Sequence, residues 1–239
     1  MEVIIFLGFA GFALAFILAL QCIALTTFGY FSFREEPATL NLRVFDPSRL
    51  LPPWYAREFF DRVCRELEEY GFKTLAFLRS WDENGELMVL LHNREQMDIA
   101  IAHASKSYNH VEYVTNFANG FGVCTINCRQ LLYAEESNPR KNIYWHPRVE
   151  ILNLYRVHRE ILEKYGSSFP KILPPEEKAV QYLLDSIRKD KEYQMTAGYK
   201  KYDAHSDTFS VTIKGALILA WKSSVPIGQI RSLIHKCPI

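Results

Sequence analysis

The chain has 239 residues, and its 28 Lys/Arg against 27 Asp/Glu give a formal net charge of +1. No segment recurs with a period of about 20–50 residues and no tract is of low complexity, which excludes a repeat array. The five cysteines are odd in number and scattered, which excludes a disulfide framework and favours a reducing compartment: Cys22, Cys64, Cys124, Cys128 and Cys237.

The amino-terminal segment is strongly apolar. Between Val3 and Leu25 no residue is charged, and fourteen positions are Leu, Ile, Val or Phe. At ~1.5 Å per residue, a helix of this length covers the ~30 Å hydrocarbon core of a bilayer. The segment lacks the basic start and the small-x-small cleavage site of a signal peptide. We therefore expect residues 1–33 to form a single, retained transmembrane helix.

The charges beside this segment predict its orientation. Basic residues follow it and none precedes it: Arg34, Arg43 and Arg49. Because positive residues favour the cytoplasmic side, we expect a single-pass membrane protein whose soluble domain is cytoplasmic. Small residues recur within the segment at a spacing that lets transmembrane helices pack closely and would allow a homodimer: Gly11, Ala15 and Ala19.

A linker and a first amphipathic helix come next. Residues 34–51 contain Pro37 and Pro47 and are expected to be a linker, and residues 52–170 are expected to form an α+β domain. Pro52-Pro53 and Gly71 are typical start and stop signals of a helix. Between them, apolar residues recur at helical spacing: Phe59, Phe60, Val63, Leu67 and Tyr70.

The hydrophobic period then changes from helical to alternating. Five runs are typical of strands: TLAFLRSW, ELMVLLH, DIAIAHAS, VEYVTNF and FGVCTINC. Short turns join them at Asn84-Gly85, Tyr108-Asn109 and Asn119-Gly120, and turns this short connect antiparallel neighbours. We therefore expect an antiparallel sheet of about five strands.

Helices are expected after the sheet. Residues 132–147 are predicted to be a loop, followed by an amphipathic helix that ends at Gly166. A further helix is predicted after Pro174-Pro175. Helix, antiparallel sheet and helices in this order indicate an α+β fold, with amphipathic helices flanking the sheet.

Residues 171–239 are predicted to form a basic carboxyl-terminal subdomain of a helix, a β-hairpin and a helix. Residues 188–239 hold nine Lys/Arg and four Asp/Glu, a net charge of +5. The stretch GYKKYDAHSDTFSVTIKGALILAW reads as two strands around a turn at residues 203–207, followed by a helix near Lys214-Gly215. This order resembles the wing and final helix of winged-helix regulators, a resemblance that implies nucleic-acid binding. Trp221 and Lys222 also suit a helix that lies on an anionic membrane surface, alongside Arg34 as a membrane-flanking residue.

His158 is the histidine of most interest, because it lies within an apolar helical stripe between Arg156 and Arg159. A buried imidazole needs hydrogen-bond partners, and a satisfied core histidine is the common outcome. A ligand-binding or acid/base role is the alternative, since burial and neighbouring charges can tune the imidazole pKa. Substitution of His158 is therefore expected mainly to lower stability.

No motif indicates a catalytic, cofactor-binding or metal-binding site. Cys124 and Cys128 fall on one predicted strand, where four residues at ~3.3 Å separate their Cα atoms too widely for one zinc ion or a disulfide. The function expected is a membrane-anchored binding or sensing module with a protein or anionic lipid partner and no cofactor. The alternatives are a membrane-tethered enzyme with an unrecognised site, and a nucleic-acid binder through the winged-helix-like end.

Overall fold

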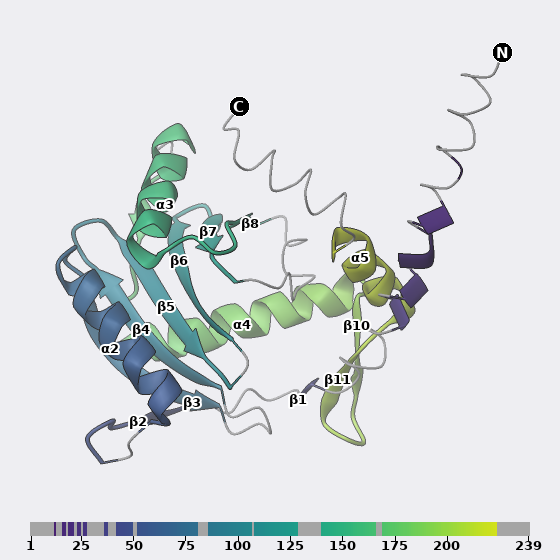
Figure 1. Cartoon of the computed structure of the whole chain (residues 1–239), viewed down its shortest axis with the longest axis horizontal. Helices are drawn as coiled ribbons and strands as arrows, with labels where there is room; N and C mark the ends of the chain where they lie inside the picture. Colours follow the sequence, from purple (N-terminus) through teal and green to yellow (C-terminus); the bar gives the residue numbers. More distant parts are fainter. Residues whose placement is uncertain are drawn as a thin grey trace. The chain divides into compact units, whose positions relative to one another are not determined.

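The computed structural model describes residues 12, 16–17, 19–21, 23–24, 26–27, 36–37, 42–49, 52–80, 86–106, 108–128, 140–165 and 169–223. The chain divides into two compact units (Figure 1). The larger unit contains Thr39–Gln130 and Glu135–Asp190, and the smaller contains Met1–Ala38, Leu131–Ala134 and Lys191–Ile239.

The larger unit is built on an eight-stranded sheet. Seven strands lie in the order β2-β3-β4-β5-β6-β7-β8, and β9 pairs with β6 off this path. Neighbouring strands are antiparallel except for β7 and β8, which are parallel. The strands are β2 Leu42–Phe45, β3 Lys73–Ser80, β4 Leu87–Asn93, β5 Asp98–Ala104, β6 Asn109–Phe117, β7 Gly122–Ile126, β8 Lys141–Trp145 and β9 Lys171–Ile172.

The α+β class is confirmed, but the predicted sheet of about five strands was too small. Strands β3 to β7 correspond to the five runs read from the sequence. The expected linker supplies β2, and the expected loop at residues 132–147 supplies β8. Both are short strands at the two ends of the path, so each is fixed by pairing with one neighbour rather than by its own periodicity.

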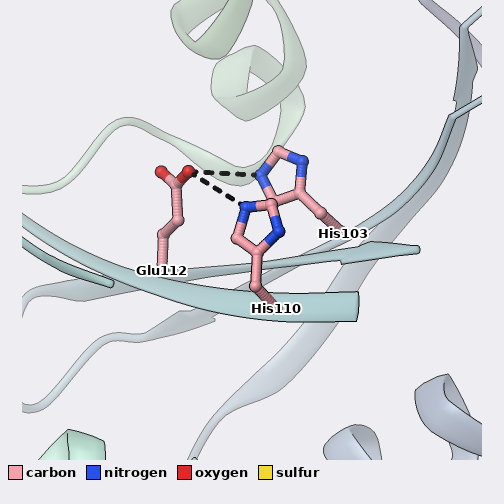
Figure 2. A group of neighbouring side chains, drawn as sticks. All are labelled: His103, His110 and Glu112. Carbon is pink, nitrogen blue, oxygen red and sulfur yellow. Dashed lines mark ion pairs between the residues drawn. The ribbon is translucent and has the colours of Figure 1, made fainter. Parts of the chain in front are cut away.

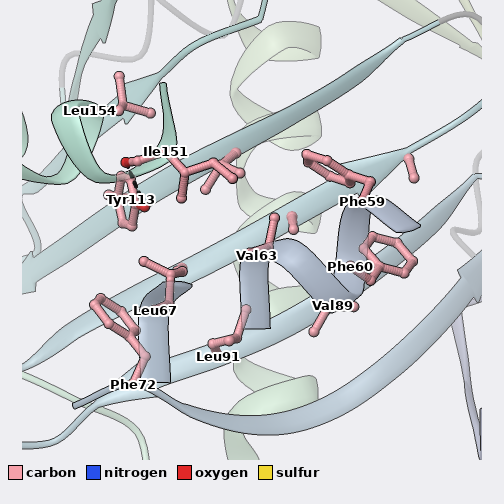
Figure 3. Close-up of a cluster of buried hydrophobic side chains, with 14 of the residues drawn as sticks. Phe59, Phe60, Val63, Leu67, Phe72, Val89, Leu91, Tyr113, Ile151 and Leu154 are labelled. Atoms are coloured by element: carbon pink, nitrogen blue, oxygen red, sulfur yellow. Dashed lines mark hydrogen bonds between the residues drawn. The ribbon is translucent and has the colours of Figure 1, made fainter. Parts of the chain in front are cut away.

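Helix α2, Trp54–Glu68, covers one face of the sheet and forms the larger of its hydrophobic clusters with β4 and β5 (Figure 3). Four residues of the stripe read from the sequence are buried here, with Val63 and Leu67 fully enclosed, and Tyr70, which follows the helix, is half-buried. The helix ends at Glu68, three residues before the predicted stop signal Gly71, which lies in the following turn with a φ of +81° that suits a residue without Cβ. The backbone N–H of Phe72 donates a hydrogen bond to the Leu67 carbonyl at 3.0 Å. The side chains of Phe72 and Leu67 are both buried in the core.

Helices α3 and α4 complete the larger unit. Helix α3, Ile151–Tyr165, packs beside α2 on the same face, where Ile151 and Leu154 join the first cluster. Tyr113 of β6 donates a hydrogen bond to the Ile151 carbonyl at 3.0 Å (Figure 3). The first part of α4, Ala179–Thr196, covers the opposite face, after a 3-10 turn η2 at Glu176–Lys178. The sheet is therefore a middle layer between helices.

The smaller unit confirms the predicted hairpin and the helix after it. Strands β10, Lys200–Asp203, and β11, Thr208–Val211, pair antiparallel, and β1, Glu36–Pro37, pairs with β11. Helix α5 spans Ile213–Ser223. Gly215 lies so close to the chain before β10 that a Cβ would stand 2.2 Å from the Tyr199 carbonyl oxygen. Glycine is therefore required where α5 meets the hairpin.

The prediction of a transmembrane anchor at residues 1–33 needs correction. Among the helices in the described ranges, none combines the length and the apolar character needed to cross a bilayer. An uncharged run meets only the compositional requirement, and spanning also needs an unbroken apolar helix of about 20 residues. The single-pass membrane protein and its cytoplasmic soluble domain are not supported. Most of residues 1–33, Arg34, and the side chains of Trp221 and Lys222 lie outside the described residues.

Candidate metal centre

His158 lies in the interior of the larger unit with no exposed surface. Its Nδ1 lies 2.8 Å from Thr125 Oγ1, and its Nε2 lies 2.9 Å from Thr115 Oγ1. Thr115 donates its hydroxyl proton to Asp98 at 2.5 Å, so this hydroxyl accepts from the Nε2–H of His158. Thr125 then donates to Nδ1. The network assigns His158 to the neutral tautomer that carries its proton on Nε2.

Burial lowers the pKa of His158 to about 4, although the nearby Asp98 charge acts in the opposite direction. The imidazole is therefore neutral at pH 7, and both of its nitrogens have partners. Because it contacts threonines of β6 and β7, it joins α3 to two strands of the sheet. The geometry favours the core-histidine interpretation over an acid/base role.

Arg156 and Arg159, the other two candidate residues from the sequence, have different surroundings. Arg159 donates to Asp98 Oδ2 at 3.2 Å, and Asp98 is fully buried. Arg156 is exposed and lies 3.5 Å from the Tyr70 hydroxyl oxygen. Arg159 thus contacts Asp98 directly and His158 is connected to it through Thr115, while Arg156 lies on the solvent side of α3.

A second titratable group lies on the opposite face of the same sheet. Along β5, Ala100 and Ala102 face α2, whereas Ile99 and Ile101 face the α4 side, so His103 points to the α4 side. The hairpin register places His103 directly opposite His110 of β6. Glu112 follows His110 by two residues and shares its face.

Three ligand atoms converge in this group, one each from His103, His110 and Glu112 (Figure 2). All three lie within 4.8 Å of one another. Glu112 Oε1 is 3.6 Å from His103 Nε2 and 3.5 Å from His110 Nε2. The two imidazole rings are stacked, with centroids 4.4 Å apart and planes 7° from parallel.

Glu86 orients the first of these imidazoles. Its Oε1 lies 3.0 Å from His103 Nδ1 and also accepts a hydrogen bond from the Tyr108 hydroxyl at 3.4 Å. A carboxylate can only accept, so the Nδ1 of a neutral His103 carries the proton. Its Nε2 lone pair then faces the Glu112 carboxylate. Carboxylate partners at the second nitrogen are typical of metal-binding histidines.

The electrostatics of the group favour a cation. Burial alone would raise the pKa of Glu112, but hydrogen bonding to His110 and the charges of the two histidines and Lys141 lower it to about 2. Burial lowers the pKa of His110, and the neighbouring His103 adds to the effect. Metal binding requires neutral imidazoles, and in that state the carboxylates of Glu86 and Glu112 carry two negative charges, while Lys141 is paired with Asp190. One divalent cation would balance them.

Two further side chains define the edge of the group. Cys124 of β7 is buried and its Sγ lies 4.0 Å from Glu112 Oε2, outside the three converging ligand atoms. Lys141 of β8 is 3.4 Å from Asp190 of α4. The candidate ligand atoms are two nitrogens and one oxygen.

Sequence spacing did not reveal this group. The two histidines are separated by a hairpin turn, so no short ligand motif contains them. The hairpin register brings them together, but the turn predicted at Tyr108-Asn109 lies too far along the chain to pair His103 with His110. Comparisons with models of known families, with curated proteins and with solved structures find no match to this chain.

Proposed function

We propose that the larger unit is a binding module for one divalent transition-metal ion, with zinc as the preferred ion. The observation that carries this proposal is the convergence of His103, His110 and Glu112 ligand atoms within 4.8 Å. Imidazole nitrogens and a carboxylate oxygen are a common zinc ligand set, and three protein ligands leave a fourth position for water or another ligand.

Two of the three separations between the ligand atoms suit zinc. Bonds of about 2.0–2.1 Å in a tetrahedral site place ligand atoms about 3.3–3.4 Å apart. The two nitrogen-to-oxygen separations, 3.5 and 3.6 Å, are close to this value. The imidazole lone pair lies in the ring plane, so the two stacked rings must rotate slightly apart for both to bind one ion. Glu86 keeps its hydrogen bond to His103 during a small rotation.

The location suits binding or sensing more than catalysis. The side chains of His103, His110 and Glu112 are 14%, 8% and 20% exposed, which limits access of a large substrate. Metal binding would hold β5 and β6 together at the hairpin, so occupancy would be coupled to local stability. The expected protein or lipid partner stays a prediction.

Nucleic-acid binding through the hairpin of the smaller unit has less support. Its exposed turn carries Asp203 and Asp207. The backbone N–H of His205 lowers the pKa of Asp203, so this carboxylate is ionised at neutral pH and would repel phosphates. The predicted hairpin is present, but its tip is acidic.

Isothermal titration of the metal-free full chain with Zn²⁺ tests the proposal. One ion per chain should bind the wild-type protein. Glu112→Gln should weaken binding at least about tenfold, because it removes a charged ligand without changing the shape of the side chain. His205→Gln is the matched control, since His205 is exposed in the smaller unit. Equal affinity in the original chain and Glu112→Gln, with both folded by circular dichroism, would contradict the proposal.

A further inference from the structure

An open depression of about 450 Å³ lies on the larger unit, on the face of the sheet covered by α2 and α3. Its lining includes Tyr70 after α2 and three residues of α3, namely Tyr155, Arg156 and Arg159. The group of His103, His110 and Glu112 lies on the other face of the sheet. This second feature therefore needs an explanation of its own.

Two tyrosines give the depression an aromatic surface. The rings of Tyr70 and Tyr155 meet edge to face, with centroids 6.1 Å apart. Tyr155 is fixed, because it is buried and its hydroxyl donates to Asp98 Oδ2 at 3.1 Å. Tyr70 is only partly buried, so its ring is accessible to a ligand.

Three basic side chains lie beside these rings, Arg156, Arg159 and Lys171, and the acidic side chains Asp98, Glu160 and Glu163 equal them in number. Arg159 and Lys171 both contact the buried Asp98 carboxylate, at 3.2 and 3.5 Å. Arg159 uses one terminal nitrogen for this contact, and a guanidinium has five N–H donors in total. Arg156 lies one turn earlier on α3, and among the described residues it forms no ion pair. Its contacts are the Asn153 side-chain oxygen and the Tyr70 hydroxyl, both at 3.5 Å.

We propose that this depression binds a small organic anion that carries a planar ring. The carboxylate or phosphate group of the ligand lies between Arg156 and Arg159, whose forked donors suit such groups, and the ring packs on Tyr70. Arg159 is held in place by Asp98, so part of the site is organised before the ligand binds. This inference is independent of the metal proposal.

Glu160 and Glu163 also line the depression and limit which anions it accepts. Both are exposed, and neither forms an ion pair with the arginines among the described residues. Their negative charges repel an anionic ligand, and the intervening water weakens this repulsion. A singly charged ligand is therefore favoured over a highly charged one, and neutralising Glu163 should tighten binding.

Titration of the full chain with benzoate and with phenyl phosphate, followed by ligand-observed NMR and calorimetry, tests the proposal. With about nine or more non-hydrogen atoms in each probe, dissociation constants on the order of 1 mM are expected. Arg156→Gln should weaken binding about tenfold, as expected for loss of one charge-assisted contact. Glu163→Gln should tighten it about twofold. Arg57→Gln, an exposed arginine of α2, should leave it unchanged.

Comparing the probes shows how much the anionic group and the ring each contribute to binding. Benzoate, with a single charge, should bind more tightly than phenyl phosphate, and the opposite order would identify a phosphate ligand and contradict the limit set by Glu160 and Glu163. Benzamide, which keeps the ring without the charge, and acetate, which keeps the charge without the ring, should both bind more weakly. The proposal is overturned if neither aromatic anion binds, if benzamide binds as well as benzoate, or if Arg156→Gln has no effect.

Discussion

His158 should make the stability of the larger unit fall in mild acid. Its pKa in the folded protein is about 4, because burial disfavours the charged ring, whereas an exposed histidine has a pKa of about 6.5. Below pH 6.5 the unfolded chain takes up a proton at this position while the folded chain does not. Protonation therefore favours unfolding, and stability is lost as pH falls from 6.5 toward 4.

The size of this effect follows from the two pKa values. Relative to pH 7.5, the lost stability is about 1.4 kcal/mol at pH 5.5 and approaches about 3 kcal/mol at pH 4. His158→Gln removes the titration, and its amide can still donate to one threonine and accept from the other. Urea unfolding of both proteins at pH 7.5 and 5.5, with chelator present, measures the difference. An equal loss of stability in the two proteins would refute the assignment of a neutral, buried His158.

Three further outcomes are expected. Leu67→Ala removes a fully buried side chain of α2 and should lower the unfolding free energy by about 2–5 kcal/mol in urea titrations, with a change below about 1 kcal/mol arguing against this core. Glu86→Gln should weaken Zn²⁺ binding about 10- to 100-fold in calorimetry, because it disturbs the carboxylate that orients His103, and unchanged affinity would argue against that role. Gly215→Ala forces a Cβ against the Tyr199 carbonyl and should expose the smaller unit to limited proteolysis, whereas wild-type resistance would contradict that close approach.

Local signals were sufficient for the elements whose own sequences carry them. The helix from Trp54 and the turn at Gly71 that follows it were predictable from an apolar stripe and a residue that tolerates positive φ. The hairpin at residues 200–211 followed from two short strands around a polar turn. In each case the information lies within about twenty residues of chain, where periodicity and turn chemistry act together.

Features that depend on distant pairing were not predictable in this way. Strand β8 was read as part of a loop, because its strand character comes from parallel pairing with β7 across intervening residues. The amino-terminal run had the composition of a transmembrane helix, but no spanning helix is found within the described residues.

The candidate site shows the same division. His158 was recognisable as a polar residue in an apolar stripe, but its threonine partners lie on strands 33 and 43 residues away in sequence. His103 and His110 could be brought together only through the hairpin register. Glu86, which immediately precedes β4, could not be connected with either histidine before the sheet order was known.

X-ray absorption at the zinc edge of the zinc-loaded full chain tests the central claim most directly. The account predicts a first shell of nitrogen and oxygen at about 2.0–2.1 Å, with the multiple scattering of two imidazoles. That signal should be lost or reduced to one imidazole in His110→Gln. A first shell dominated by sulfur at about 2.3 Å, or one without imidazole scattering, would show that His103, His110 and Glu112 do not hold the metal.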